Sequence, residues 1–109
     1  MQKNIFKGLP AQSDNEWTEE LFKNQNINIE RIASYGIPSP DKFWYNQPTD
    51  EWVMLVSGEA ELQFKEQASI NLKAGDYVFI PAGKEHRVSY VSREPNCIWL
   101  AIHFKTGQL

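Results

Sequence analysis

Residues 75–86 restrict the fold of this 109-residue chain more than any other segment, because turn residues and strand residues alternate in it at short intervals. The segment reads Gly-Asp-Tyr-Val-Phe-Ile-Pro-Ala-Gly-Lys-Glu-His. Its apolar residues 77–80 predict a strand that ends at Pro81, which has no N–H to donate to a sheet ladder. Pro-Ala-Gly predicts a tight corner, and a second strand begins at His86. The imidazole of His86 is therefore expected where a strand leaves a turn, which is a rigid position for a ligand.

Short strands separated by turns are predicted along the rest of the chain as well. Residues 58–64 alternate most clearly, with Ala60, Leu62 and Phe64 on one face and polar residues on the other. This pattern is typical of an all-β protein, a small antiparallel sandwich or barrel. The predicted strands are residues 27–33, 43–47, 51–57, 58–64, 69–72, 77–80, 86–91 and 97–104.

Composition indicates one domain and argues against nucleic acid or a membrane as the partner. The net charge is -3 and no cluster of Lys or Arg interrupts the mixed charges, so the basic surface that nucleic acid or an anionic membrane requires is missing. No segment approaches the roughly 20 apolar residues of a membrane span, and no apolar core of a signal peptide begins the chain. The only cysteine, Cys97, cannot form an intrachain disulfide, which fits a reducing compartment. We therefore expect a cytoplasmic protein.

The spacing around the opening segment resembles the second signature of the cupin family, G-x5-P-x-G-x2-H-x3-N. Gly75, Pro81, Gly83 and His86 are in register with it, whereas Tyr90 replaces the final Asn. The first cupin signature, G-x5-H-x-H-x3,4-E-x6-G, is half present: Glu51 and Gly58 keep their spacing, but its two His positions fall on Tyr45 and Gln47. The resemblance covers roughly residues 33–104 and implies a double-stranded β-helix, the jelly-roll barrel of cupins.

On this basis we expect a cupin barrel at residues 27–109 and a short N-terminal extension at residues 1–26 that packs on the outside of the barrel. Ser13 and Glu16 have the spacing of a capping box, which predicts a helical turn at about residues 17–23, although an irregular segment fits as well.

In cupins, residues of the two signatures converge in the barrel and hold a divalent metal through imidazoles and one carboxylate. Carried over residue by residue, the resemblance implies Glu51 and His86 as metal ligands for one zinc, iron, nickel or manganese ion. Two ligands are too few for tight binding, because transition-metal sites normally take three or four. His103 is the candidate for a third ligand, and the sequence leaves open whether it faces inward with Trp99 and Ala101.

A metal-free pocket is the alternative, because Tyr45 and Gln47 are poor ligands for such metals and suggest hydrogen bonding instead. His86 would then transfer a proton, with Glu51 or Tyr45 as the opposite group. Candidates for binding a small organic ligand are Tyr45, Gln47, Trp52, Tyr77 and Trp99.

Three hypotheses follow for the function. The preferred one is a small single-domain cupin that binds a small organic ligand, with or without a weakly held metal. The second is a metal-dependent cupin enzyme, either a dioxygenase or a sugar-phosphate isomerase or epimerase, and the third is a non-catalytic sensor or scaffold. Whether the chain is an enzyme is left open. A homodimer is expected from the resemblance and from the aromatic fraction of 13%, which exceeds what so small a core can bury.

Overall fold

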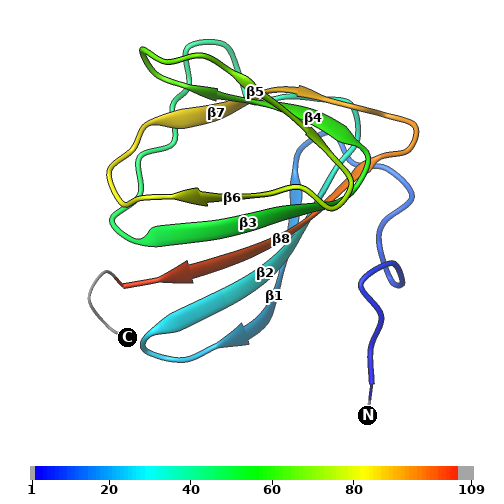
Figure 1. Cartoon of the computed structure of the whole chain (residues 1–109). Coiled ribbons are helices and arrows are strands. Elements are labelled where there is room, and N and C mark those ends of the chain that lie inside the picture. Colours follow the sequence, from blue (N-terminus) through cyan, green and yellow to red (C-terminus); the bar gives the residue numbers. More distant parts are fainter. Residues whose placement is uncertain (1, 106–109) are drawn as a thin grey trace.

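Eight antiparallel strands make up the computed structural model, which describes residues 2–105 (Figure 1). The all-β prediction is confirmed, and residues 106–109 of the predicted barrel lie outside the described residues. Within residues 2–105 no helix is long and apolar enough to cross a membrane. The strands are β1 (Trp17–Lys23), β2 (Ile27–Ser34), β3 (Asp50–Ser57), β4 (Glu59–Phe64), β5 (Ile70–Lys73), β6 (Tyr77–Ile80), β7 (His86–Val91) and β8 (Cys97–Phe104).

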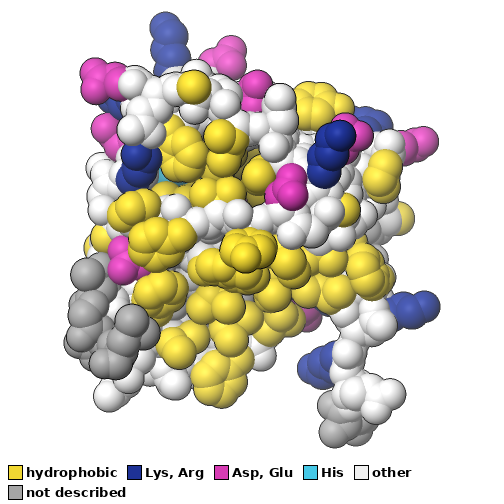
Figure 2. Space-filling model, in the orientation of Figure 1, with side chains coloured by type: hydrophobic (Ala, Val, Ile, Leu, Met, Phe, Trp, Pro, Cys, Tyr) yellow, Lys and Arg dark blue, Asp and Glu magenta, His cyan; other side chains and the backbone are white. Residues whose placement is uncertain are grey.

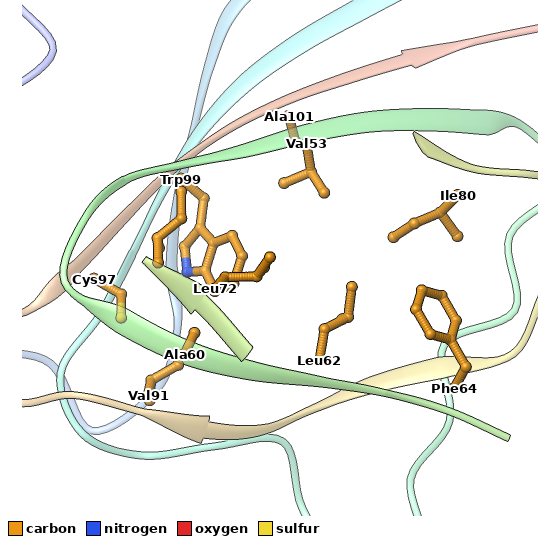
Figure 3. Close-up of a cluster of buried hydrophobic side chains, with 11 residues drawn as sticks. Val53, Ala60, Leu62, Phe64, Leu72, Ile80, Val91, Cys97, Trp99 and Ala101 are labelled. Carbon is orange, nitrogen blue, oxygen red and sulfur yellow. The ribbon is translucent and has the colours of Figure 1, made fainter. Parts of the chain in front are cut away.

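The strands form two sheets that face each other. The first has the order β1-β2-β8-β3-β6 and the second the order β5-β4-β7 (Figure 1). Between the sheets lies a core that includes Leu55 and Ala101 from the first sheet and Leu62 and Leu72 from the second, all nearly inaccessible to solvent (Figure 3). This arrangement follows from the period-2 alternation of each strand, which directs every second side chain toward the opposite sheet.

Gly58 joins the two sheets, because β3 in the first sheet and β4 in the second are separated by this one residue. Its φ is +91°, a backbone conformation that L side chains rarely adopt. A Cβ at this position would lie 2.9 Å from Cys97 Sγ and 2.9 Å from Ser92 Oγ. Glycine is therefore required here for both conformation and space.

The prediction of a helical turn at residues 17–23 is wrong, since this segment is β1. It pairs in antiparallel register with β2, from Trp17 opposite Ala33 to Lys23 opposite Asn28. Asn24 closes the hairpin between the two strands: its side-chain oxygen accepts from the N–H groups of Asn26 and Ile27, at 2.8 and 2.9 Å. Residues 24–26 are thus the turn of a hairpin.

Arg31 of β2 holds the segment of residues 4–10, here called the N-terminal arm, against the outside of the first sheet. Its Nη1 donates to the carbonyl oxygens of Asn4, Ile5 and Lys7 at 3.3, 3.0 and 2.6 Å. Its Nε donates to Glu19 Oε1 at 2.7 Å. Only 7% of the Arg31 side chain is exposed, so the guanidinium is neutralised and hydrogen-bonded where water has little access.

Residues 43–47, predicted as a strand, form a loop that makes a single bridge to a sheet. Tyr45 exchanges two backbone hydrogen bonds with His86, N–H to O=C, at 2.7 and 3.1 Å. Pro40 and Pro48 lie on either side of this segment, and proline cannot donate to a ladder, so the pairing does not extend into a strand.

The outer face of the first sheet is apolar where β3, β6 and β8 lie side by side. The rings of Trp52 and Tyr77 are tilted by 35° with their centroids 5.3 Å apart, and the ring centroids of Phe79 and Phe104 lie 6.3 Å apart. Tyr77 and Phe79 are 65% and 51% exposed. Figure 2 shows hydrophobic side chains gathered over this sheet. We define the outer patch as Trp52, Met54, Tyr77, Phe79, Ile102 and Phe104, which are register neighbours on the three strands.

Candidate functional site

A hollow of about 200 Å³ lies between the two sheets, and it combines an apolar wall with a polar wall. Figure 3 shows part of the apolar wall, where Val53 and Ile80 of the first sheet face Leu62 of the second. The polar side chains that line the hollow are Glu16, Thr18, Glu30, Tyr45, Gln47, Glu51, His86 and His103, and its apolar side chains are Ile32, Val53, Leu62, Ile80, Val88 and Trp99.

His86 enters the hollow from the second sheet, at the first residue of β7, and is only 5% exposed. The corner of residues 81–85 fixes its ring, because Nδ1 lies 2.9 Å from the carbonyl oxygen of Lys84. A carbonyl only accepts, so this contact requires a proton on Nδ1 that His86 donates. In the neutral ring, Nε2 then carries a lone pair, which faces Glu51.

Glu51 enters from the first sheet, near the start of β3, and is 7% exposed. Its Oε1 lies 3.8 Å from His86 Nε2, which is longer than a hydrogen bond, so both atoms can still form hydrogen bonds with a ligand. Burial raises the pKa of the Glu51 carboxyl above its ordinary value of 4.5; His103 and His86 oppose this rise in pKa and Glu30 adds to it. The two predicted residues are thus brought together from opposite sheets, with a carboxyl that holds its proton more strongly than a free one.

Tyr45 and Gln47 also line the hollow, from the loop that precedes β3. The Tyr45 ring stacks on the His86 ring with centroids 5.6 Å apart and planes at 27°. Burial, and after it Glu16, raises the pKa of the Tyr45 phenol, and Glu51 adds a smaller increase. The phenol therefore keeps its proton at neutral pH and can donate a hydrogen bond.

His103 faces into the hollow, which answers the question of orientation that the sequence left open. It lies directly opposite Glu51 in the pairing of β8 with β3, so the two side chains share one face. Its Nε2 lies 3.2 Å from Glu30 Oε1 of β2. His103 thus contacts Glu30, and both His103 and His86 lie near Glu51 and oppose the rise in the pKa of its carboxyl.

The donor set does not fit a preformed metal centre. Among residues 2–105 no group of three His, Cys, Asp or Glu side chains is placed to hold a metal ion. Of the predicted set, Glu51 and His86 are 3.8 Å apart, and the Nε2 of His103 contacts Glu30 at 3.2 Å. A tight transition-metal site normally needs three or four protein ligands, so the polar wall matches hydrogen bonding to a ligand better than metal coordination.

Trp99 lines the hollow, but two aromatic residues that we expected there do not. Trp52 and Tyr77 belong to the outer patch on the opposite face of the sheet. The reason is the alternation of β3: because Glu51 and Val53 point inward, Trp52 between them must point outward, and Tyr77 lies beside it.

Sequence reasoning missed two further carboxylates of the hollow, Glu16 and Glu30. Glu30 shares the inward face of β2 with Ile32. Glu16 lies at the rim of the hollow, where it is exposed to solvent on one side and surrounded by protein atoms on the other. Desolvation, and after it Glu51 and Glu30, raises the pKa of its carboxyl. A hairpin prediction for residues 17–34 would have brought Glu16 to this side of the sheet.

Similarity to known proteins covers the segment that contains most of this site. The model of the family described as Cupin domain matches residues 38–103. The uncharacterized protein YdbB of Bacillus subtilis (strain 168) is 37% identical over 82 residues, which span 70% of this chain and 73% of that protein.

Solved structures agree with the architecture. A crystal structure described as that of a "putative mannose-6-phosphate isomerase" from Ralstonia eutropha JMP134 superposes with a TM-score of 0.93 at 36% identity, over 97% of this chain and 99% of that one. An RmlC-like cupin family protein with a double-stranded β-helix fold, from Methanocaldococcus jannaschii, gives a TM-score of 0.70 at 15% identity over 90% and 87% of the two chains. The predicted double-stranded β-helix is thereby confirmed.

Proposed function

The chain belongs to the cupin family, and from this membership we propose that it binds a small organic ligand in the hollow between its two sheets. The observation that carries the proposal is the meeting of Glu51 and His86, which are buried, come from opposite sheets and stand 3.8 Å apart without a hydrogen bond between them. A buried carboxyl and a buried imidazole that face each other in a hollow with an apolar wall are typical of binding sites.

The chemistry that this pair supports is proton transfer on the bound ligand. His86 offers a lone pair at Nε2 and can take up a proton, since its Nδ1 proton is held by the Lys84 carbonyl. Glu51 and Tyr45, whose pKa values are raised, are the groups that can return a proton. A scaffold would have no use for such a pair, so we place the non-catalytic hypothesis behind a working pocket.

We expect Glu51→Gln and His86→Gln to weaken the binding of compounds that bind the unsubstituted protein by about tenfold or more, because each change removes a hydrogen bond to a charged or strongly polar group. The measurement is a screen of small neutral, cationic and anionic compounds by ligand-observed NMR, followed by titration of each hit against both variants. Glu85→Gln, which alters a carboxylate outside the hollow, is the matched control and should leave affinities unchanged.

The stability of Glu51→Gln separates loss of the site from loss of the fold. A carboxyl whose pKa is raised on folding lowers the free energy of unfolding once the pH exceeds its unfolded pKa, near the ordinary value of 4.5. The glutamine variant should therefore be at least as stable as the unsubstituted protein at pH 7 in urea denaturation, and the difference should vanish below about pH 4. In the binding screen, compounds that bind Glu51→Gln and His86→Gln as tightly as the unsubstituted protein would contradict the proposed site.

Sugar-phosphate isomerisation is the second candidate, because the structure that superposes over 99% of its length is described as a putative mannose-6-phosphate isomerase. The donor set of the hollow argues against the metal-dependent form of this activity, as described above. Mannose 6-phosphate therefore belongs among the compounds that are tested.

We further propose that two copies of the chain associate through the outer patch. An apolar sheet face whose Tyr77 and Phe79 are 65% and 51% exposed is typical of a surface that another protein covers. Light scattering should give twice the chain mass of 12.6 kDa for the unsubstituted protein, and Phe79→Asp should give the monomer mass. Tyr90→Asp, at a residue that is 53% exposed on the other sheet, is the control and should remain dimeric. A monomer mass for the unsubstituted protein would contradict the proposal.

A further inference from the structure

The charges that line the hollow are mostly acidic. Three glutamates, Glu16, Glu30 and Glu51, face two histidines, and no Lys or Arg is among the side chains that the structure places on its walls. Each histidine is already next to one glutamate, at 3.8 Å for His86 and Glu51 and 3.2 Å for His103 and Glu30. The third carboxylate, Glu16, has no basic partner among the residues that line the hollow.

The basic residues nearest in sequence to His86 are engaged elsewhere. Arg87 donates to Gln63 Oε1 at 3.0 Å and to the Ser39 carbonyl at 2.9 Å, so it holds a loop outside the hollow. Lys84 lies over the Phe64 ring, with Nζ 5.3 Å from its centroid. A phosphate or carboxylate in the hollow would therefore meet carboxylates, with no Lys or Arg among the lining residues to balance its charge.

The polar wall offers several hydrogen-bond acceptors. The three carboxyl groups, the Gln47 side-chain oxygen and the His86 Nε2 lone pair can accept, whereas the Thr18 and Tyr45 hydroxyls and the Gln47 amide nitrogen can donate. A second hollow shares Glu30, Gln47 and His103 with the first, and in it the buried side-chain oxygen of Asn28 has no hydrogen-bond partner within the described residues. Lys23 and Lys105 also line this second hollow, so the unsatisfied acceptor indicates a place for a donor beside the first hollow and not inside it.

The pKa directions agree with this electrostatic picture. Glu51 and Glu30 both raise the pKa of the Glu16 carboxyl, after desolvation, and Glu30 raises that of Glu51. The negative charges in the hollow thus repel one another, and a cation placed among them would relieve that repulsion.

We propose that the hollow takes a small amine, bound as an ammonium ion with its N–H groups toward Glu16, Glu30 and Glu51 and its apolar part against Val53, Ile80 and Trp99. This inference rests on the proposed function, since it names the chemical class of the ligand for the same hollow. An ammonium ion fits the acidic wall better than a sugar phosphate does, because each ammonium N–H can donate to a carboxylate and the carboxylates balance the charge of the ligand.

Three probes of nearly equal size and different charge test the proposal: benzylammonium, benzyl alcohol and benzoate. Each is titrated into the full-length protein at pH 7, with affinity from calorimetry and location from the NMR signals of His86 and the Trp99 indole. Benzylammonium should bind about tenfold or more tightly than benzyl alcohol, as one charge-assisted hydrogen bond contributes about 1.5–3 kcal/mol. Benzoate and mannose 6-phosphate should bind more weakly than either.

Variants separate local charge from net charge. Glu30→Gln and Glu16→Gln should each lower the preference for benzylammonium over benzyl alcohol by about threefold or more, whereas Glu66→Gln, the same change in a turn outside the hollow, should leave it unchanged. If benzyl alcohol or an anion binds as tightly as benzylammonium, the inferred ligand class is wrong and the proposed pocket stands. If no probe shifts the His86 or Trp99 signals, the proposed pocket and the inference both fail.

Discussion

Replacing Gly58 by alanine is expected to lower the free energy of unfolding by about 3–4 kcal/mol, because the added methyl group meets two separate obstacles. The first is its φ of +91°. The second is contact, since the Cβ would lie 2.9 Å from Cys97 Sγ and 3.0 Å from the Asn96 carbonyl oxygen. Neighbouring hydrogen bonds keep these atoms in place: Cys97 Sγ donates to the Glu59 carbonyl, and Ser92 Oγ donates to the Pro95 carbonyl at 2.6 Å.

Gly75→Ala is the matched control for this prediction. Gly75 has a similar φ of +97°, but a Cβ there would find nothing within 4 Å. This variant should lose only the conformational part, about 1–2 kcal/mol. Urea denaturation of the three proteins measures both effects. Equal destabilisation by the two substitutions would show that the contacts with Cys97 and Ser92 relax without cost.

Arg31→Met is expected to cost about 2–3 kcal/mol and to release the N-terminal arm, because it leaves three carbonyl oxygens without their donor. It also removes the partner of Glu19, whose side chain is 43% exposed and can turn to water, so the ion pair itself contributes little of this cost. Two measurements check the prediction: urea denaturation for stability, and the rate of tryptic cleavage after Lys7, which should rise when the arm is released.

Lys65→Met provides the comparison for Arg31→Met, because it deletes a cation of a surface ion pair. Lys65 and Glu85 are 3.5 Å apart, and their side chains are 47% and 37% exposed. Such pairs contribute less than about 1 kcal/mol. If Arg31→Met were as mild as Lys65→Met and left cleavage after Lys7 unchanged, the arm would be held by something other than the guanidinium.

The strands that carry most of the core could be predicted from sequence, because the apolar residues within each strand mark the face that is buried. Apolar and polar residues alternate regularly over residues 58–64, so only one register of this strand places Leu62 in the core. Pro81 ends β6 because proline has no N–H to donate to the sheet. The resemblance to the two cupin signatures implied Glu51 and His86, and Gly58, Gly75 and Gly83 of these signatures all have positive φ at turns of the chain.

What could not be predicted depends on partners that lie far away in the sequence. Residues 17–23 have a helical start signal, but pairing with β2 decides their conformation, and no local pattern reports that pairing. Both faces of β2 are covered: Glu30 points into the hollow, and Arg31 points outward under the N-terminal arm. The sequence therefore does not show which of these two charged residues faces the hollow. The position of His103 depended on its register with Glu51 across β8 and β3.

The single-residue connection at Gly58 also determines how the two walls of the hollow can move. The sheets are covalently tied at that corner, while Glu51 and His86 stand at the far ends of β3 and β7, several residues from it. At this end the corner of residues 81–85 joins Ile80 of β6, in the first sheet, to His86 of β7, in the second. A molecule that contacts both Glu51 and His86 would add a non-covalent link beside this corner, and we expect it to make both sheets more rigid.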